Sequence, residues 1–576
     1  MPVTRSLRPV FHLRKRVQSS IFACSRYNSS SSSTEPNVLK SPFKSIEIPK
    51  ISISELVFDR TEKWGNLIAT ECSITGRNYT YGQMQKYAKN LTGALRKKFK
   101  LNKGDVVAVH LPNSPEYAIV ALGILHGGMI ATTLNPIYTK DEVARQLVDS
   151  GAKVIITLND LWPLAKAAVD LSKKPVTILT ANSKEGQSTP QGAISLKEML
   201  QQDVDISDIS QPSADEIAFL PYSSGTTGLP KGVELTHFNI ISNLYQLGIP
   251  DLDYLEVPSE THQETIPNIL PQFHIYGLTV TLLFTTLKGC KNISLPKFDP
   301  KLFIETLVKH RPSALLVAPP LIIFMSQDVV KAEYLSSIRR IVCGAAPLGA
   351  LDEERFLTKV NYKAKIAQGY GMTETSPVIS FTSKWHPLTP GSSGQPVSNT
   401  EVKIVDTKDP TLPALGPKQH GELMVRGPQI MKGYHNRPKE TQDIFHEGWL
   451  RTGDIGFYDD NGNLTITDRL KELIKVKGFQ VPPAELEEVI REYPDVAEVG
   501  VIGIPHELYG EVPRAYISVK PGAQFDENKL HEFVKNKVAS YKELKGGIGV
   551  IDSIPKNAAG KILRRQLKNL YEQHQR

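Results

Sequence analysis

Residues 105–126 contain an apolar run of strand length that is closely followed by an apolar run of helix length. The first run, residues 105–111, is short and almost continuously apolar, as in a strand that is buried on both faces. The second run, residues 116–126, is long enough for about three helical turns. Residues 154–157 form another short apolar run. This alternation predicts an α/β fold in which helices cover mostly parallel sheets.

The length of the chain requires more than one domain. A single hydrophobic core stops growing at roughly 250–300 residues, whereas this chain has 576. The character of the sequence changes near residue 468, where the charged stretch Asp-Arg-Leu-Lys-Glu begins. We therefore expect a large N-terminal domain with several subdomains over residues 35–468, a hinge at residues 469–472 and a small, mobile α+β domain over residues 473–576.

The predicted small domain shows the periodicities of both helices and strands. Pro483 suits the first turn of one helix, and apolar residues recur at helical spacing over residues 530–538. Residues 497–504 and 515–519 are apolar runs that suit strands. Both element types in one compact segment are typical of an α+β domain.

Two polar segments interrupt the predicted large domain. Residues 180–214 are rich in Ser, Gln, Asp and Pro, which predicts surface connections, and the acidic residues 251–266 predict a loop. No run of about 18 apolar residues occurs, so we expect no membrane-spanning helix. Contact with a membrane surface and the oligomeric state stay open.

The first 34 residues carry six basic side chains, many serines and no acid. This composition is typical of a mitochondrial transit peptide that is removed after import. A disordered basic N-terminus without an address is the alternative. Without these six charges the net charge falls from +8 to +2, which gives no electrostatic case for binding nucleic acid. From the transit-peptide composition of residues 1–34 we expect a protein of the mitochondrial matrix.

Four cysteines occur, and none of them has the spacing of a metal site. They are Cys24, Cys72, Cys290 and Cys343. Cys24 would leave with the transit peptide. The sequence thus predicts neither a disulfide framework nor a zinc site.

A loop rich in glycine and hydroxyl residues predicts a phosphate site. Residues 223–232 read Ser-Ser-Gly-Thr-Thr-Gly-Leu-Pro-Lys-Gly. Glycines let backbone N–H groups approach a ligand closely, while the hydroxyl groups and Lys231 add donors and a positive charge. The spacing differs from that of the P-loop NTPases. A flexible surface loop is the alternative, but the two hydroxyl pairs and the Pro-Lys-Gly ending favour a polyphosphate site.

Further motifs follow in the same order as in a known family. Residues 368–374 read Gln-Gly-Tyr-Gly-Met-Thr-Glu, residues 451–455 read Arg-Thr-Gly-Asp-Ile, and residues 555–565 end in Ala-Gly-Lys-Ile-Leu-Arg-Arg. Together with the loop at 223–232, they resemble the adenylate-forming superfamily of acyl-CoA synthetases, coumarate-CoA ligases and firefly luciferase. The resemblance covers nearly the whole chain after residue 50 and is strongest with the coumarate-CoA-ligase-like acyl-CoA synthetases.

The resemblance implies a nucleotide site in which Tyr370 stacks on adenine, Asp454 holds the ribose and Glu374 binds Mg²⁺. A flat ring suits the base, and a carboxylate suits a hard cation that also binds phosphate oxygens. The implied ATP- and AMP-binding residues are Ser223, Ser224, Gly225, Thr226, Thr227, Lys231, Gly344, Ala345, Gln368, Gly369, Tyr370, Thr373, Asp454, Arg469, Lys471 and Lys561.

Two lysines are implied for two half-reactions. Lys561 would stabilise the charge that develops when a carboxylate attacks the α-phosphate of ATP, a step that depends on positioning and electrostatics. Lys475 would contact the adenylate after the small domain turns about the hinge. The implied catalytic residues are Lys561, Lys475, His274, Thr373 and Glu374, and the implied CoA-binding residues are Lys297, Lys477 and Gly478.

Residues 271–277, Pro-Gln-Phe-His-Ile-Tyr-Gly, resemble the part of the family that encloses the acid. The implied acyl-pocket residues are Ile275, Tyr276, Val280, Pro377 and Val378. Val280 is a departure, because plant coumarate ligases can carry a hydroxyl residue six positions after this histidine. The change removes a partner for a phenol and favours a more apolar acid, such as a medium-chain fatty acid, over an aryl-propenoic acid.

The leading hypothesis is therefore an AMP-forming acid–CoA ligase that uses ATP, Mg²⁺ and CoA. A luciferase-like oxygenase that adenylates an acid and then oxidises it is one alternative. An enzyme that loads an acid onto a carrier protein is another. A binding protein that has lost catalysis is disfavoured, because Lys231, Glu374, Asp454, Arg469 and Lys561 are all present.

Overall fold

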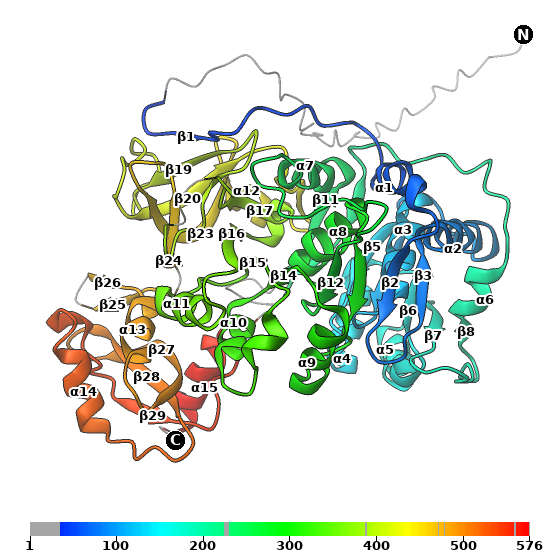
Figure 1. Ribbon diagram of the computed structural model, residues 1–576. Coiled ribbons are helices and arrows are strands. Elements are labelled where there is room, and N and C mark those ends of the chain that lie inside the picture. The colour runs from blue at the N-terminus through cyan, green and yellow to red at the C-terminus, as the bar shows by residue number, and fades with distance from the viewer. Residues whose placement is uncertain are drawn as a thin grey trace, which may run out of the picture. The chain divides into compact units, whose positions relative to one another are not determined.

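The computed structural model has a large N-terminal domain and a smaller C-terminal domain, each built from helices and strands (Figure 1). The predicted transit peptide and most of the predicted phosphate loop lie outside the described residues. The structure describes residues 35–223, 230–385, 389–470, 472–476, 479–557 and 560–574.

The largest sheet has nine strands and contains the segments on which the fold prediction rested. Its order is β10-β11-β9-β5-β4-β6-β7-β8, with β21 paired to β11, and β4 to β9 run parallel. The strands are β4 (Val106–His110), β5 (Ile130–Thr133), β6 (Val154–Leu158), β7 (Thr177–Ala181), β8 (Ile194–Ser195), β9 (Ile217–Phe219), β10 (Tyr222–Ser223), β11 (Lys231–Thr236) and β21 (Gly433–Tyr434). The predicted strands at 105–111 and 154–157 are confirmed as β4 and β6.

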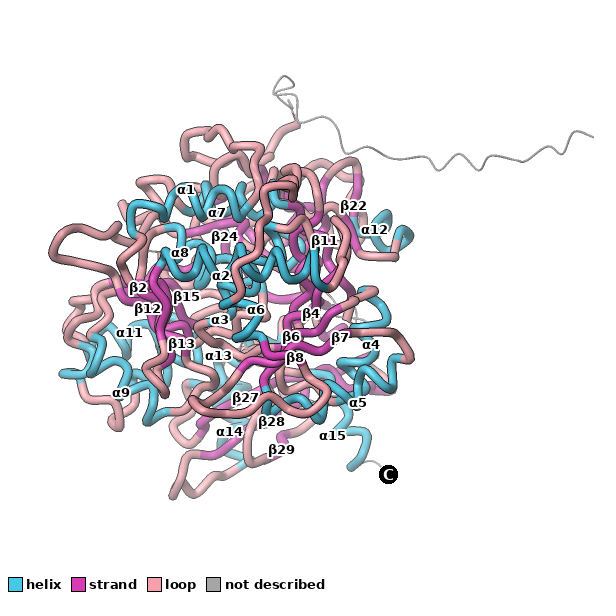
Figure 2. The backbone as a smooth tube through the Cα atoms, turned by 90° about the vertical axis from the view of Figure 1, so that its right-hand side faces the viewer, coloured by secondary structure: helices cyan, strands magenta, loops and turns pink. Residues whose placement is uncertain are grey.

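Helices cover both faces of this sheet, as Figure 2 shows around β4, β6 and β7. Successive side chains of a strand point to opposite faces. Val107 and Val109 of β4 accordingly join the core formed with α2 (Tyr81–Gly93) and α3 (Glu116–His126). Val106 and Ala108 join a second core, formed with α4 (Lys140–Ser150) and α5 (Trp162–Ser172). The predicted helix at 116–126 is confirmed as α3.

Two further sheets of the large domain combine parallel and antiparallel strand pairs. One has the order β12-β13-β2-β3 and the other β14-β15-β16-β17-β18. Their strands are β2 (Ile68–Cys72), β3 (Asn78–Thr80), β12 (Thr265–Asn268), β13 (Lys291–Ser294), β14 (Ala314–Val317), β15 (Arg340–Cys343), β16 (Lys365–Gly371), β17 (Val378–Phe381) and β18 (Gln395–Pro396). The helices nearby are α1 (Ile53–Thr61), α7 (His237–Leu247), α8 (Thr285–Leu287), α9 (Pro300–His310), α10 (Pro319–Ser326), α11 (Ala350–Lys359) and the π-helix η4 (Tyr276–Phe284).

The fourth sheet of the large domain is antiparallel, which the prediction of mostly parallel sheets did not include. Its order is β1-β19-β20-β23-β22, with β24 paired to β23. Antiparallel neighbours such as β23 and β24 need only a short turn between them, so no helix-length segment marks them in the sequence. The elements are β1 (Leu39–Lys40), β19 (Glu401–Val405), β20 (Gly421–Arg426), α12 (Pro438–Ile444), β22 (Phe445–His446), β23 (Trp449–Tyr458) and β24 (Leu464–Arg469).

The C-terminal domain has a five-stranded sheet with its own hydrophobic core. The predicted strands and both predicted helices are confirmed, although the second helix ends at Lys535, before the predicted Val538. Asp526 caps that helix by accepting hydrogen bonds from the N–H groups of Asn528 and Lys529. The elements are β25 (Ile474–Val476), β26 (Phe479–Val481), α13 (Pro483–Arg491), β27 (Val496–His506), β28 (Gly510–Val519), α14 (Glu527–Lys535), β29 (Ile548–Val550) and α15 (Arg564–His574).

The predictions for the two polar segments were wrong in part. Residues 180–214 contain β8 and the helix α6 (Leu196–Gln201), whose first turn is capped by Ser195 and whose Leu196 is buried. The acidic segment 251–266 is a loop until β12 begins, but it buries Leu252. In both segments a few apolar residues anchor the chain although the composition is polar. No helix in the described part of the chain is long and apolar enough to cross a membrane.

Candidate nucleotide and acid site

The parallel strands β15 and β16 bring two predicted nucleotide segments together. Cys343, the last residue of β15, lies opposite Gln368 of β16, so Gly344 and Gly369 follow at the same edge of the sheet. A Cβ atom on Gly344 would lie 3.2 Å from the Tyr276 ring and 3.4 Å from the carbonyl oxygen of Gly369. The small residues thus allow a close approach of backbone and ring at the carboxyl ends of the strands, where ligands of open α/β sheets bind.

The residues predicted to hold adenine and ribose are in direct contact. The phenolic hydroxyl of Tyr370 donates to Oδ2 of Asp454 at 2.7 Å. Nε of Arg469 lies 3.2 Å from the other oxygen, Oδ1. Asp454 and Arg469 face each other across β23 and β24, while Tyr370 comes from β16. Two sheets therefore converge on one buried carboxylate.

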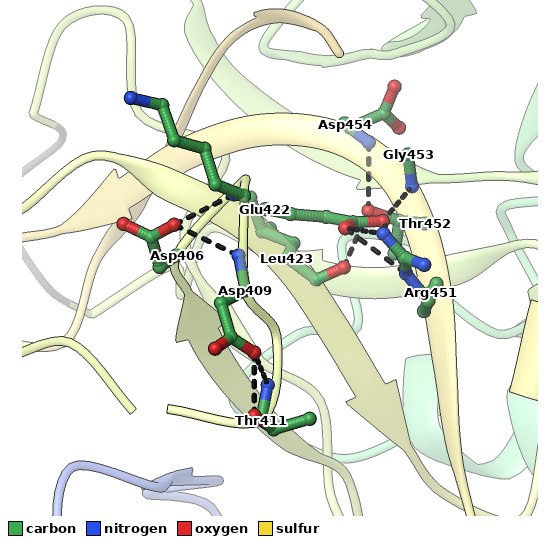
Figure 3. Close-up of polar contacts among 10 residues, drawn as sticks. Asp406, Asp409, Thr411, Glu422, Leu423, Arg451, Thr452, Gly453 and Asp454 are labelled. Atoms are coloured by element: carbon green, nitrogen blue, oxygen red, sulfur yellow. Dashed lines mark hydrogen bonds and ion pairs between the residues drawn. The ribbon is translucent and has the colours of Figure 1, made fainter. Parts of the chain in front are cut away.

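The turn that carries Asp454 is held by a network beneath it (Figure 3). Glu422 of β20 is buried and accepts from the guanidinium group of Arg451 and from the N–H of Gly453. The hydroxyl of Thr452 donates to the carbonyl oxygen of Leu423 and accepts from the N–H of Asp454. Gly453 has φ +69°, a backbone conformation that favours glycine. The Thr-Gly-Asp sequence is thus fixed by side chains of the neighbouring strand.

Glu374, the predicted magnesium ligand, is a buried carboxylate, and Tyr434 lies between it and Lys231. Its Oε1 accepts from the hydroxyl of Tyr434 at 2.9 Å, and Nζ of Lys231 lies 5.1 Å from the centre of the Tyr434 ring. Burial raises the pKa of Glu374, and hydrogen bonds from Tyr434 and Ser223 lower it in part. Ser223, at one end of the predicted phosphate loop, therefore interacts with Glu374 directly, whereas Lys231, near the other end, contacts the ring of Tyr434.

Sequence reasoning missed Tyr434. It lies on β21, opposite Val233 of β11, and so connects a distant part of the chain to the residues around the phosphate loop. Lys-Gly-Tyr-His at 432–435 carries no pattern that singles it out. Only the pairing of β21 with β11 reveals its position.

Lys561 lies in a tight hairpin of the small domain and is close to the nucleotide residues. The N–H of Lys561 donates to the Asn557 side chain at 2.8 Å, and Lys556 pairs with Ile562 across the turn. The pKa of Lys561 is lowered to about 8, first by burial and then by the positive charge of Arg469; the carboxylates of Glu472 and Asp454 act in the opposite direction. The predicted adenylation lysine is thus brought to the predicted ribose site.

The predicted acid residues line the start of η4 and the edge of the adjoining sheet. Burial lowers the pKa of His274 to about 4, so this ring is neutral at pH 7. The hydroxyl of Tyr276 donates to the carbonyl oxygen of Val342 at 3.2 Å. Ile275, Tyr276 and Val280 are buried. Pro377 precedes β17, and the N–H of Val378 donates to Asn243 of α7 at 3.1 Å.

The remaining predicted residues lie in different surroundings. Ala345 has φ +74° beside Gly344, and Thr373 begins a short 3₁₀ turn with Glu374. The side chain of Gln368 donates to Glu353 and is occupied by that contact. Lys297 and Lys475 are exposed. The predicted residues Ser224, Gly225, Thr226, Thr227, Lys471, Lys477 and Gly478 lie outside the described residues.

The fold and this arrangement define an enzyme that activates carboxylates with ATP, and comparison with known proteins agrees. The model of the AMP-binding enzyme family matches residues 57–435, and that of the AMP-binding enzyme C-terminal domain matches residues 485–561. The chain belongs to the AMP-binding enzyme family. It is an AMP-forming acid–thiol ligase, and its adenylate-forming relatives include the coumarate-CoA ligases.

Relatives of known activity match over nearly their whole length. The chain is 38% identical to 4-coumarate–CoA ligase 3 of Oryza sativa subsp. japonica, over 92% of this chain and 94% of that protein. It is 37% identical to 4-coumarate–CoA ligase 1 of Petroselinum crispum, over 93% and 97%. Among solved structures, ATP-bound MatB from Rhodopseudomonas palustris matches with a TM-score of 0.80 and 27% identity, over 90% of this chain and 99% of that one.

Proposed function

We propose that this enzyme joins a carboxylic acid to CoA in two steps at the site described above. In the first step a carboxylate oxygen attacks the α-phosphorus of ATP, the bond to pyrophosphate breaks, and an acyl-adenylate forms. In the second step the sulfur of CoA attacks the acyl carbon, and AMP leaves with the bonding electron pair. The acid is a medium-chain fatty acid or an aryl-propenoic acid, and the absence of a hydroxyl group at Val280 favours the former.

The observation that carries this proposal is the position of Lys561 relative to Asp454 and Arg469. The charges of Arg469 and Asp454 both act on the pKa of Lys561. Tyr370 donates a hydrogen bond to Asp454. A lysine beside the ribose residues is suited to stabilise the charge of the phosphate under attack, because positioned charges act strongly in a site that excludes water. His274 stays neutral and therefore does not attract the acid carboxylate into an ion pair.

Glu374 suits the Mg²⁺ that the family implies. Burial raises the pKa of Glu374, and the hydrogen bonds and the positive charge of Arg469 offset that rise only in part, so a cation bound to this carboxylate would stabilise its charged form. Glu374 and phosphate oxygens would hold the ion, because Mg²⁺ prefers one or two carboxylates with phosphate and water. Bound there, Mg²⁺ would neutralise charge on the departing pyrophosphate. Ser223 and Tyr434 orient the carboxylate.

The test is AMP release from ATP and Mg²⁺ with CoA, measured over acetate, straight-chain acids from C6 to C16, benzoate and coumarate. The protein is assayed as the full chain and without residues 1–34, with Lys561→Ala as the control. We expect AMP formation that needs both the acid and CoA and that the control loses. Adenylate without thioester would instead support the oxygenase or the carrier-loading alternative, and no activity with any acid would refute the proposal.

We further propose that the enzyme acts in the mitochondrial matrix. The support is the composition of residues 1–34, which are rich in Arg and Ser and free of acids. The test is import of the full chain and of a chain without residues 1–34 into isolated mitochondria. We expect that only the full chain becomes protected from added protease and is shortened. If both chains behave alike in the import assay, the proposal is contradicted.

A further inference from the structure

A small apolar cavity lies behind Val280. Its volume is about 20 Å³, which is room for roughly one methyl group. The residues around it come from three places: α7 with the loop after it, η4, and the sheet that carries Gly344 and Gly369. Leu252, Val280, Phe284 and Phe381 are among them, and in the described part of the chain no polar atom lines the cavity. Such a space stays dry and favours an apolar group.

The cavity shares its walls with the predicted acid site. Val280 follows Tyr276 by one turn on η4, and Phe284 follows Val280 by another. Val342 also lines the cavity and lies two residues before Gly344 on β15. Phe381 lies opposite Gly369 in the pairing of β17 with β16. The cavity therefore adjoins the segments that are predicted to hold the acid.

The hydroxyl group of one lining residue is unsuited to recognise a phenol. The hydroxyl of Tyr254, whose side chain lines the cavity, donates to the carbonyl oxygen of Thr382 at 3.0 Å. The Tyr254 ring packs edge-on against Phe381, with 5.7 Å between the ring centres. A ligand that places a hydroxyl group in the cavity would lose its hydrogen bonds to water without an evident replacement, which is costly. A methyl group has no such penalty.

We infer that this cavity receives the terminal carbon of an unbranched aliphatic acyl chain and so sets the chain length that the enzyme prefers. The inference rests on the proposed acid–CoA ligase function and narrows its substrate to straight-chain aliphatic acids. The cavity holds about one methyl group. The acyl chain that fits best is therefore the one whose terminal methyl group just reaches the cavity. A longer chain must displace Leu252 or Phe284, and a shorter one leaves the cavity empty.

The experiment measures kcat/KM for AMP formation by the full chain with straight-chain acids from C4 to C12 and with 4-coumarate. Up to the optimum, each added methylene is expected to raise kcat/KM about fourfold, the gain for moving one such group out of water. Leu252→Phe fills the cavity and should move the optimum to a shorter acid, with at least a tenfold loss on the wild-type optimum. Phe284→Val enlarges the cavity and should move the optimum to a longer acid.

Leu147→Phe is the matched control, because it adds the same ring at a buried leucine of the other core, and it should leave the optimum where it is. Thermal unfolding shows whether each variant is folded. If Leu252→Phe does not fold, Phe284→Val tests the inference by itself, because it should move the preferred chain length in the opposite direction. An optimum that none of these variants moves would overturn the inference, and so would a preference for 4-coumarate. In both cases the ligase function stands, whereas inactivity of the wild type with every acid would overturn both.

Discussion

The hydroxyl group of Tyr370 donates to Oδ2 of Asp454 at 2.7 Å, across two different sheets. This bond joins the residue expected to stack on adenine to the residue expected to hold the ribose. Arg469 contacts the other oxygen of the same carboxylate. The carboxylate therefore has a fixed orientation before a nucleotide arrives, which lowers the cost of ordering on binding.

Tyr370→Phe removes the phenolic donor but keeps the ring. A hydrogen bond to a charged group contributes about 1.5–3 kcal/mol, so kcat/KM for ATP should fall between roughly tenfold and a hundredfold, mostly through a higher KM. The measurement is acid-dependent exchange of pyrophosphate into ATP. Tyr458→Phe, which removes a hydroxyl from the antiparallel sheet that carries Asp454, serves as the control. An unchanged KM for ATP in Tyr370→Phe would show that the bond has no part in binding.

The rate of adenylation should depend on the protonation of Lys561. Because burial and Arg469 lower its pKa to about 8, the ammonium is the main form below pH 8 and is lost as the pH rises through 8. If the charge is needed, the rate of the first half-reaction falls over that range. Pyrophosphate exchange measured from pH 6.5 to 9.5 gives the profile.

Lys561→Arg provides the matched comparison for this profile. Arginine stays charged over the whole range, so the variant should be slower but lose the fall near pH 8. A fall of the same shape in the variant would assign the titration to another group. Arg469→Gln removes a positive neighbour and should move the fall to higher pH.

The hairpin of Lys561 depends on a glycine that is pressed against the large domain. Gly560 has φ +80°, and a Cβ atom there would lie 2.5 Å from Cγ of Pro320. Gly560→Ala must therefore displace the hairpin, and adenylation should fall at least tenfold, since small misplacements of a catalytic group are costly. Thioester formation from a supplied acyl-adenylate should change less.

Gly522→Ala separates backbone strain from this clash. Gly522 also has φ +80°, but nothing lies within 4 Å of the position that a Cβ atom would take there, so the substitution adds only the strain. It should lower stability without the selective loss of adenylation. Equal effects of the two substitutions on adenylation would show that contact with Pro320 is unimportant.

Glu422→Gln weakens the network beneath the Asp454 turn, shown in Figure 3. Glu422 is buried and pairs with Arg451 at 2.6 Å, while Arg451 is one-third exposed. Because that exposure lets water replace part of the lost pairing, we expect a decrease of about 1–2 kcal/mol in the free energy of unfolding. Urea unfolding measures it. Glu401→Gln, which removes the partner of Arg426 nearby, is the control and should leave ATP binding intact, whereas Glu422→Gln should weaken it.

Much of the fold could be predicted because the local periodicity of apolar residues indicates its helices and strands. The strands β4 and β6 and the helix α3 are buried continuous apolar runs, and α13 begins at the proline that suits its first turn. The antiparallel sheet and the short helix α6 were not predicted. Their residues alternate with polar ones or sit in polar surroundings, so their stability comes from partners that are distant in the sequence.

The candidate site also has residues that the sequence predicted and residues that only the structure revealed. The sequence predicted roles for Lys231, Glu374, Asp454 and Lys561, because the motifs that carry these residues resemble those of the adenylate-forming superfamily. Tyr434 could not be identified, since its position depends on the pairing of β21 with β11. The same holds for the contact of Tyr370 with Asp454.

By itself the sequence determined the class of chemistry, since short motifs of fixed spacing carry the groups that bind ATP. Tertiary structure alone decided the environment of those groups: the burial that lowers the pKa of Lys561, the contact between Gly560 and Pro320, and the apolar cavity behind Val280. The physical reason is that burial and packing depend on which distant segments meet. A motif specifies its own side chains but not the dielectric and the space that surround them.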